Sequence, residues 1–271
     1  MDKSGETEMQ KERVGLTGIQ AAIFDMDGTI VDTEKDGHRV AFNEAFSQFG
    51  IKAAWNIAKY QELLKIAGGK ERMKFYFQED GRKYLPKGKS LDDIVQQLHL
   101  LKTEIFVSLI ENGKLPLRPG IKRIMKEANE KGILIGICTT SNEKAVKAIV
   151  NSLLKDVKID LILAGDIVTK KKPDPEIYLL ALQKTGLSGN EALVIEDSEN
   201  GVIAGKEAGL KVLVTVNEYT KNENLILADA IVSSLGKENE KSQILAGSLK
   251  LSDCQIVHIN DLCEFRLEPK R

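Results

Sequence analysis

The sequence predicts an α/β fold: a doubly wound (Rossmann-like) parallel sheet as the core, with an inserted α-helical cap domain. From residue 116 onward, short apolar runs alternate with helical patterns, which is typical of parallel strands joined by helices. Between residues 34 and 115 apolar residues recur at helical spacing with no convincing strand. The predicted domains are therefore a core of residues 18–33 and 116–271, a cap of residues 34–115, and a disordered or trimmed tail at 1–17.

The elements follow from the pattern in chain order. Apolar, largely β-branched runs predict core strands at 19–24, 133–138, 161–164, 192–195, 211–216 and 230–232. Helical spacing predicts cap helices near 40–49, 60–66, 73–77 and 91–110, and core helices at 120–131, 143–154, 176–185 and 201–208. The region 236–271 is irregular, although residues 256–259 could add an edge strand.

Composition excludes several classes of function. Of 271 residues, 42% are hydrophobic and 29% charged, which fits a soluble globular protein, and the net charge of -1 gives no reason to expect a nucleic-acid or membrane partner. No apolar run reaches the ~18 residues of a membrane helix. The cysteines lack metal-site spacing; Cys138 is expected in the core, and Cys254 and Cys263 as thiols, with a disulfide between them left open.

Two acids follow the first predicted strand directly. Side chains alternate along an extended chain, so Asp25 and Asp27 point to one spot beyond the strand end, and Gly28 allows a tight turn there. Crowded acids are costly unless a cation or proton joins them. Ligands of such sheets bind at this edge, so we expect a metal-assisted carboxylate pair.

Other strand ends and one loop carry complementary groups. Thr139 follows the second strand and Glu196–Asp197 the fourth, while Lys172 lies in a loop. Acid pairs, a hydroxyl and a lysine make a phosphoryl-transfer set, and the cation that suits carboxylates and phosphate is Mg²⁺. Each group has a simpler interpretation: Thr139 and Ser141 could cap a helix, Lys172 could be solvated, and the acids could mark a helix start.

The ordered set Asp25-x-Asp27-Gly28-Thr29, Thr139, Lys172–Pro173 and Glu196–Asp197 resembles the four motifs of the haloacid dehalogenase superfamily. This resemblance implies that Asp25 is the nucleophile, that Asp27 is the general acid/base, and that Thr139 and Lys172 hold the phosphoryl group. The implied Mg²⁺ ligands are Asp25, Asp27, Asp197 and Glu196, with Glu196 either a ligand or its neighbour.

The cap and its flanks contain five short motifs: Asp32-Thr33-Glu34, Gly68-Gly69-Lys70-Glu71-Arg72, His99-x-x-Lys102, Leu117-Arg118-Pro119-Gly120 and Ser141-Asn142-Glu143-Lys144-Ala145. Within the superfamily, these motifs resemble those of the CbbY-type xylulose-1,5-bisphosphate phosphatases, which remove an inhibitory by-product of Rubisco. The resemblance implies a small sugar bisphosphate as substrate, a functional link to Rubisco without direct contact, and a chloroplast stroma location in a eukaryote or a cytoplasmic one otherwise. We also expect a monomer. The predicted substrate-binding residues are Glu34, Gly68, Gly69, Lys70, Glu71, Arg72, His99, Lys102, Arg118, Thr139, Thr140, Ser141, Asn142 and Lys144.

Alternatives remain for these residues and for the whole protein. His99 could equally be a partly buried helix residue, and His38 and His258 carry no expected role. A sugar-phosphate mutase resembling beta-phosphoglucomutase would share the core residues but return the phosphate to its substrate. A non-catalytic sugar-phosphate-binding protein on the same fold is the alternative from another class, and the pair Asp25 and Asp27 argues against it.

Overall fold

The computed structural model describes residues 18–66, 69–86, 88, 90–252 and 255–267 of the 271-residue chain. The chain divides into two compact units, which we describe separately. The core unit comprises the chain up to Thr29, Pro119–Thr140 and everything from Asp156, and the helical unit comprises Ile30–Arg118 and Ser141–Lys155. In the described part of the chain, no helix is both long enough and apolar enough to span a membrane.

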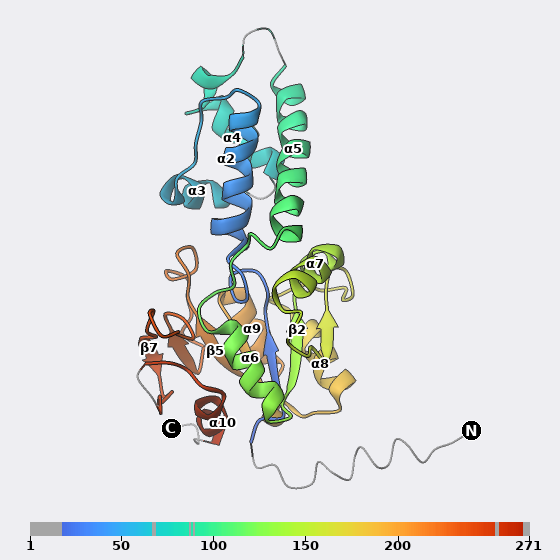
Figure 1. Cartoon of the computed structure of the whole chain (residues 1–271), viewed down its shortest axis with the longest axis vertical. Coiled ribbons are helices and arrows are strands. Elements are labelled where there is room, and N and C mark those ends of the chain that lie inside the picture. Colours follow the sequence, from blue (N-terminus) through green and yellow to red (C-terminus); the bar gives the residue numbers. More distant parts are fainter. Residues whose placement is uncertain (1–17, 67–68, 87, 89, 253–254, 268–271) are drawn as a thin grey trace, which may run out of the picture. The chain divides into compact units, whose positions relative to one another are not determined.

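A seven-stranded sheet forms the centre of the core unit (Figure 1). The strand order is β3-β2-β1-β4-β5-β6-β7, and the first six of these strands run parallel. The predicted fold class and the six predicted strands are thus confirmed, with ends shifted by at most a few residues. The strands are β1 (Ala21–Phe24), β2 (Leu134–Cys138), β3 (Leu161–Leu163), β4 (Ala192–Glu196), β5 (Lys211–Thr215), β6 (Ala230–Val232) and β7 (Ile244–Gly247).

The register of the central strand positions the site. Phe24 of β1 pairs with Ile137 of β2 on one side and with Ile195 of β4 on the other. The next residues, Asp25, Cys138 and Glu196, therefore come level at the carboxyl ends of three neighbouring strands. Strands β1 and β4 are buried along their whole length, so the residues at their carboxyl ends are held in fixed positions.

Helices cover both faces of this sheet. Helices α8 and α9 contact one another and strands β2 to β5, while α6 contacts α10 and lies in front of the sheet in Figure 1. Burial of α8 and α9 against the sheet builds the apolar core of the unit. The bounds are α6 (Ile121–Glu130), α8 (Glu176–Thr185), η3 (Gly189–Glu191), α9 (Glu199–Glu207) and α10 (Ile259–Leu267).

The C-terminal region corrects the prediction of an edge strand at 256–259. The edge strand is β7, antiparallel to β6, and α10 begins at Ile259. All four residues of β7 are exposed, and Ile244 to Ala246 are apolar in succession, so no apolar–polar alternation marks the strand in the sequence. Around residue 258 the chain turns into a helix because the Asp261 carboxylate accepts hydrogen bonds from the amides of His258 (2.8 Å) and Ser252 (2.9 Å).

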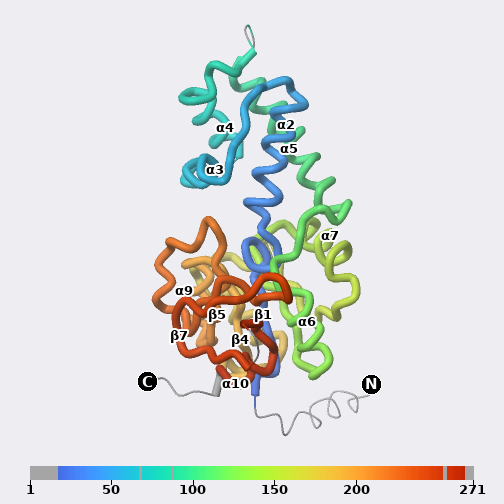
Figure 2. Tube along the Cα trace, turned by 60° about the vertical axis from the view of Figure 1, so that its left-hand side comes forward, coloured from blue at the N-terminus to red at the C-terminus, as the bar shows by residue number. Residues whose placement is uncertain are grey.

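Helix α2 packs beside α5 in the helical unit, as Figures 1 and 2 show. Aromatic side chains form its core: the Trp55 ring lies 4.8 Å from Phe42 and 4.9 Å from Phe46. The predicted cap helices are confirmed as elements. The bounds are η1 (Thr33–His38), α2 (Arg39–Gln48), α3 (Ile57–Leu64), α4 (Gly69–Gln78), η2 (Arg82–Tyr84), α5 (Leu91–Glu111) and α7 (Glu143–Leu153).

Candidate active site

Lys172 joins two of the predicted carboxylates at the strand ends. Its Nζ donates hydrogen bonds to Asp25 Oδ1 (2.7 Å), Glu196 Oε1 (2.7 Å) and the Cys138 carbonyl (3.0 Å), which accounts for all three ammonium protons. Only 9% of the side chain is exposed, so the interpretation of Lys172 as a solvated lysine is wrong. Burial by itself would lower the pKa of Lys172, but the two carboxylates hold it well above its ordinary value, and the group stays charged.

Asp25 is a buried carboxyl at the end of β1. Its backbone N–H donates to the Ile195 carbonyl (3.0 Å), which extends the strand pairing through this residue. Burial raises the pKa of Asp25 to about 7, with the charges of Glu196 and Asp27 adding to the effect and that of Lys172 opposing it. A carboxyl in this setting gains from any further cation close to it.

Glu196 is completely buried, and protein donors surround both of its oxygens. Oε1 accepts from Lys172 and from the Tyr178 hydroxyl (2.5 Å), and Oε2 accepts from the Asp197 amide (3.1 Å) and the Ser198 hydroxyl (3.4 Å). Helix α9 passes so close that a Cβ on Gly201 would lie 1.9 Å from the Glu196 carboxyl carbon. Glycine is therefore required at that position.

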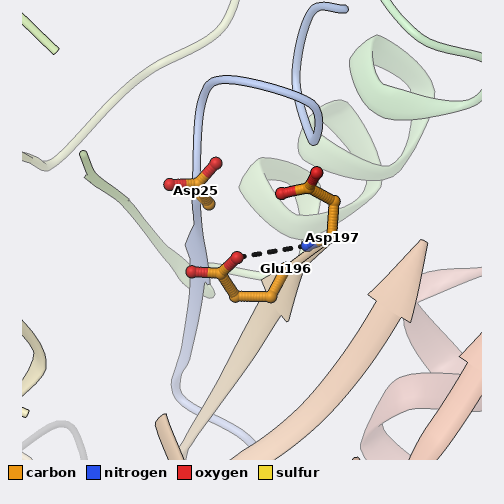
Figure 3. Close-up of side chains that lie close together, drawn as sticks. All are labelled: Asp25, Glu196 and Asp197. Atoms are coloured by element: carbon orange, nitrogen blue, oxygen red, sulfur yellow. Dashed lines mark hydrogen bonds between the residues drawn. The ribbon is translucent and has the colours of Figure 1, made fainter. Parts of the chain in front are cut away.

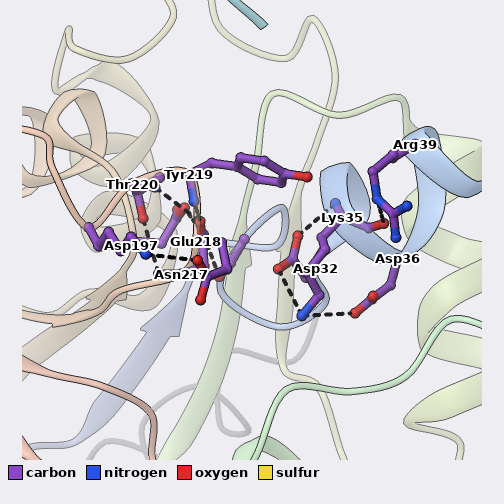
Figure 4. A network of polar contacts seen from close by, with 11 residues as sticks. Asp32, Lys35, Asp36, Arg39, Asp197, Asn217, Glu218, Tyr219 and Thr220 are labelled. Carbon is purple, nitrogen blue, oxygen red and sulfur yellow. Dashed lines mark hydrogen bonds and ion pairs between the residues drawn. The ribbon is translucent and has the colours of Figure 1, made fainter. Parts of the chain in front are cut away.

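Asn217 and Gly28 both lie against the Asp197 carboxylate, and Figure 4 shows the contact with Asn217. Asn217 donates from Nδ2 to Asp197 Oδ2 (2.8 Å), and its own Oδ1 accepts from the amides of Tyr219 and Thr220. Gly28 lies against the same carboxylate: it has φ +90°, and a Cβ there would come within 2.2 Å of Asp197 Oδ2. The turn after Asp27 and the end of β4 are thus fitted closely together.

Three buried carboxylates could hold a metal ion. Ligand oxygens of Asp25, Glu196 and Asp197 all lie within 4.8 Å of one another, and Figure 3 shows the three side chains around one spot. The donors are oxygens only, which suits a hard cation such as Mg²⁺. Because these acids are buried close together, a cation would relieve their mutual repulsion.

Thr139 and Asp27 complete the core group. Thr139 is buried, and its hydroxyl donates to Asp27 Oδ2 (3.2 Å). Thr139 does not cap the following helix: the N-cap of α7 is Asn142, whose side chain accepts from the Lys144 amide (2.9 Å). The structure therefore brings together all six core residues that the motifs predicted, from four separate stretches of chain.

A second polar cluster is buried within the helical unit. The Tyr60 hydroxyl donates to Glu34 Oε2 (2.6 Å) and accepts from Arg72 Nη1 (3.0 Å). Arg72 also donates to the carbonyls of Leu63 (3.0 Å) and Ile66 (3.3 Å), so its guanidinium is fixed at the end of α3. Glu34 and Arg72, both predicted from the sequence, are thereby connected through one tyrosine.

Lys102 lies next to that cluster with an unexpected partner. Its Nζ is 3.0 Å from His38 Nδ1 and lies over the rings of Phe42 (4.9 Å) and Phe106 (5.1 Å). Burial lowers the pKa of Lys102 to about 8, and Arg72 contributes. Burial, with the charges of Lys102 and Arg72, lowers the pKa of His38 to about 3, so His38 is neutral and its Nδ1 accepts a hydrogen bond from the Lys102 ammonium.

The remaining predicted substrate residues are less enclosed. Gly69 packs near His99, since a Cβ there would lie 3.4 Å from the His99 ring, and His99 is partly buried. Gly68 lies outside the described residues. In the helical unit Lys70, Glu71, Asn142 and Lys144 are exposed and Arg118 and Ser141 partly so, and Thr140 of the core unit is exposed.

Four residues of these clusters were missed from the sequence: Tyr178, Asn217, Tyr60 and His38. Asn217 directly follows a predicted strand, so the rule that found Asp25 and Thr139 could have found it too. Tyr178, Tyr60 and His38 lie within helical turns, where apolar spacing marks them only as core positions.

Comparison with known proteins gives consistent results. Residues 19–209 match the family described as haloacid dehalogenase-like hydrolase. A "CBBY-like protein" of Arabidopsis thaliana is 45% identical over 241 residues, covering 86% of this chain and 76% of the relative. A crystal structure of mutant CbbY from Rhodobacter sphaeroides in complex with xylulose-(1,5)bisphosphate is similar, with TM-score 0.60, 38% identity, and coverage of 80% of this chain and 94% of that one. A beta-phosphoglucomutase from Clostridium difficile gives TM-score 0.53 and 26% identity, with coverage of 80% and 91%.

Proposed function

Because the chain belongs to the haloacid dehalogenase-like hydrolase family, and within it to the CbbY-type proteins, we propose that it is a Mg²⁺-dependent phosphatase of xylulose-1,5-bisphosphate. The assignment to phosphatases rests on the family. One observation carries the mechanism: a buried Lys172 ammonium joins Asp25 to Glu196 at the strand ends, beside Asp197. This set binds and neutralises a phosphoryl group next to a carboxylate that can attack it.

The reaction then has two steps. The Asp25 carboxylate attacks phosphorus, the bond from phosphorus to the sugar oxygen breaks, and Asp27 gives its proton to that leaving oxygen. Asp27 next takes a proton from water, which attacks the phosphorus; the bond between phosphorus and Asp25 breaks and phosphate leaves. The Thr139 hydroxyl, which donates to Asp27 Oδ2 in this structure, would donate to the transferring oxygens when substrate is bound. Lys172 offsets their charge throughout.

The carboxylates of Asp25 and Asp197 and the main-chain carbonyl of Asp27 would hold Mg²⁺. Bound there, the ion would offset negative charge on the phosphoryl oxygens. Glu196 has a different role in this proposal, because its four contacts are all with protein donors. We assign it to fixing Lys172.

A bisphosphate substrate carries a second dianion, distant from the reacting phosphorus. The helical unit offers cations for it: Arg118 is partly exposed and Lys70 and Lys144 are exposed. Arginine suits bidentate contacts with phosphate. Glu34, which is partly buried, and the buried Arg72 and Lys102 offer hydrogen-bonding partners for sugar hydroxyls.

A phosphate-release panel tests this proposal. The wild-type protein is assayed with xylulose-1,5-bisphosphate, ribulose-1,5-bisphosphate and sugar monophosphates, each with Mg²⁺ and with a chelator. We expect kcat/KM for xylulose-1,5-bisphosphate to exceed that for the monophosphates by at least about tenfold, because the second phosphate adds contacts. Phosphate release at the same rate with the chelator as with Mg²⁺ would contradict the proposal. So would faster hydrolysis of monophosphates than of xylulose-1,5-bisphosphate.

The same panel decides the mutase alternative. A beta-phosphoglucomutase-like enzyme would interconvert sugar monophosphates and release little phosphate, and its similarity of fold keeps it a real competitor. Phosphate released without an activating bisphosphate supports hydrolysis. A plastid location, a functional link to Rubisco and a monomeric state stay predictions; the first is supported by the relative from a plant and is tested by imaging a fluorescent fusion.

A further inference from the structure

We infer that Tyr178 is a positioning residue for phosphoryl transfer, holding Glu196 and the Lys172 ammonium in the arrangement that Asp25 needs. The inference rests on the proposed function and deepens it. Tyr178 comes from α8, an element that carries none of the residues predicted for the site. Its part in the site is therefore visible only in the folded chain.

Tyr178 touches both charged partners at once. Its hydroxyl donates to Glu196 Oε1 at 2.5 Å, and the Lys172 Nζ lies 4.9 Å from the centroid of its ring. The side chain is completely buried. The ammonium therefore faces a carboxylate on each of two sides and an aromatic face on another, and each of these contacts favours the charged form.

The hydroxyl balances the two carboxylates that compete for Lys172. Glu196 Oε1 accepts one hydrogen bond from Lys172 and one from Tyr178. If the hydroxyl is removed, Oε1 keeps Lys172 as its one donor in a buried setting, and its attraction for the ammonium grows. Lys172 then shifts from Asp25 toward Glu196, away from the phosphoryl oxygens that it serves.

A purely structural role for the hydroxyl fits the surroundings less well. The neighbouring buried positions of α8 are Ile177, Ala181 and Leu182, all apolar and packed in the core of the unit. Phenylalanine would fill the same space without the cost of burying a hydroxyl. The Tyr178 hydroxyl forms a hydrogen bond with the Glu196 carboxylate, which in turn binds Lys172. We attribute the presence of the hydroxyl to this contact.

The test is Tyr178→Phe, which removes only the oxygen. With xylulose-1,5-bisphosphate as substrate we expect kcat to fall by roughly tenfold, the value of one hydrogen bond to a charged group. KM and the half-saturating Mg²⁺ concentration should stay within about twofold, because the interaction matters most in the transition state. The matched control is Tyr76→Phe, a buried tyrosine of the helical unit, for which kcat should not change.

A double-variant cycle separates positioning from general loosening. If Tyr178 acts through Glu196, then Tyr178→Phe combined with Glu196→Gln should lower kcat no further than Glu196→Gln alone. Should Tyr178→Phe prove unstable by itself, kcat of the double variant is compared with that of Glu196→Gln alone. In both of these proteins residue 196 is neutral, so loss of the Tyr178 hydroxyl leaves no buried carboxylate without its donor. An additive loss in the cycle would overturn the inference.

Two further outcomes bear on the inference. A kcat for Tyr178→Phe within about twofold of an active wild type would overturn it, as would a rise in KM matching the fall in kcat. A wild-type protein that releases no phosphate from any sugar phosphate would refute the proposed function itself, and that result is distinguishable because it needs no variant.

Discussion

Lys172 shows how much depends on a single side chain in this protein. Its three protons bind two carboxylates and one carbonyl, so neither Asp25 nor Glu196 is left as an isolated buried charge. Removing one partner of a buried ion pair leaves the other uncompensated, which costs far more than losing a surface pair. A substitution of Lys172 is therefore expected to lower local stability as well as the proposed activity.

Gly28 gives a prediction at the same scale. Gly28→Ala would place a Cβ 2.2 Å from Asp197 Oδ2 at φ +90°, so the carboxylate must move. We expect kcat/KM to fall at least about a hundredfold, through displacement of a candidate metal ligand. The control is Gly209→Ala, which has φ +78° and nothing within 4 Å of the added Cβ. Equal losses in both variants would mean that backbone strain alone is responsible.

Asn217 gives a second prediction, which is measured as the Mg²⁺ concentration needed for half-maximal activity. Asn217→Ala removes the amide that donates to Asp197 Oδ2, so the half-saturating Mg²⁺ concentration should rise by roughly tenfold. The control is Thr220→Ala. This substitution removes the hydroxyl that accepts a hydrogen bond from the backbone N–H of Asn217, but it leaves the Asn217 side chain free to donate to Asp197. A change in kcat without a change in Mg²⁺ requirement would contradict this role.

Individual residues were predictable where the chain itself marks them. Asp25, Thr139 and Asp197 each follow a buried apolar run, and sheet topology requires that such ends converge. Tyr178 could not be predicted in this way, because a tyrosine on an apolar helix face reads as core. What identifies its role is the distance from its hydroxyl to Glu196, which only folding creates.

At the scale of elements, the parallel strands were predictable and the C-terminal edge was not. The apolar run of β4 is buried throughout and predicts a core strand, whereas β7 is short and exposed. An exposed strand is held by its backbone pairing with β6 rather than by its side chains. Sequence pattern therefore carries little information about it.

The helical unit carries a pH-dependent contact between η1 and α5. The pKa of His38 is lowered to about 3 by burial and by Lys102 and Arg72, while the unfolded chain titrates near 6.5. Between these values the unfolded chain binds more protons, so stability is present above pH ~6.5 and falls as the pH drops. From pH 7 to 5 the loss should reach at most about 2 kcal/mol.

Urea unfolding measures this effect. The chain's one tryptophan, Trp55, is buried in the helical unit, so its fluorescence follows that unit. In His38→Gln, which cannot titrate, the loss of stability between pH 7 and 5 should be smaller than in wild type. The same pH dependence in both proteins would show that other groups are responsible.

At the scale of the whole molecule, the sequence predicted a core and an inserted helical block, and it put the helix at 143–154 (α7) in the core. By sequence α7 follows β2 directly, yet its contacts assign it to the helical unit. The pattern of a helix tells which face is apolar and not which neighbour covers it. Helix α7 and α5 contact one another within that unit.

The proposed recognition of two phosphates would involve residues far apart in the chain. We expect Arg118→Ala to raise KM for bisphosphates by roughly tenfold and KM for monophosphates much less, because a remote phosphate loses its cation. The control is Lys114→Ala, at an exposed lysine of the same unit. Equal changes in KM for both substrate classes would count against a role for Arg118 in binding the remote phosphate.

The central claim is that Asp25 carries the phosphoryl group. The most direct measurement is phosphate release from xylulose-1,5-bisphosphate by Asp25→Asn at saturating Mg²⁺, with circular dichroism to establish that the variant is folded. Asparagine keeps the shape of the side chain but is not a nucleophile, so kcat should fall at least about a thousandfold. A folded Asp25→Asn protein that retains a tenth or so of wild-type kcat would contradict the account.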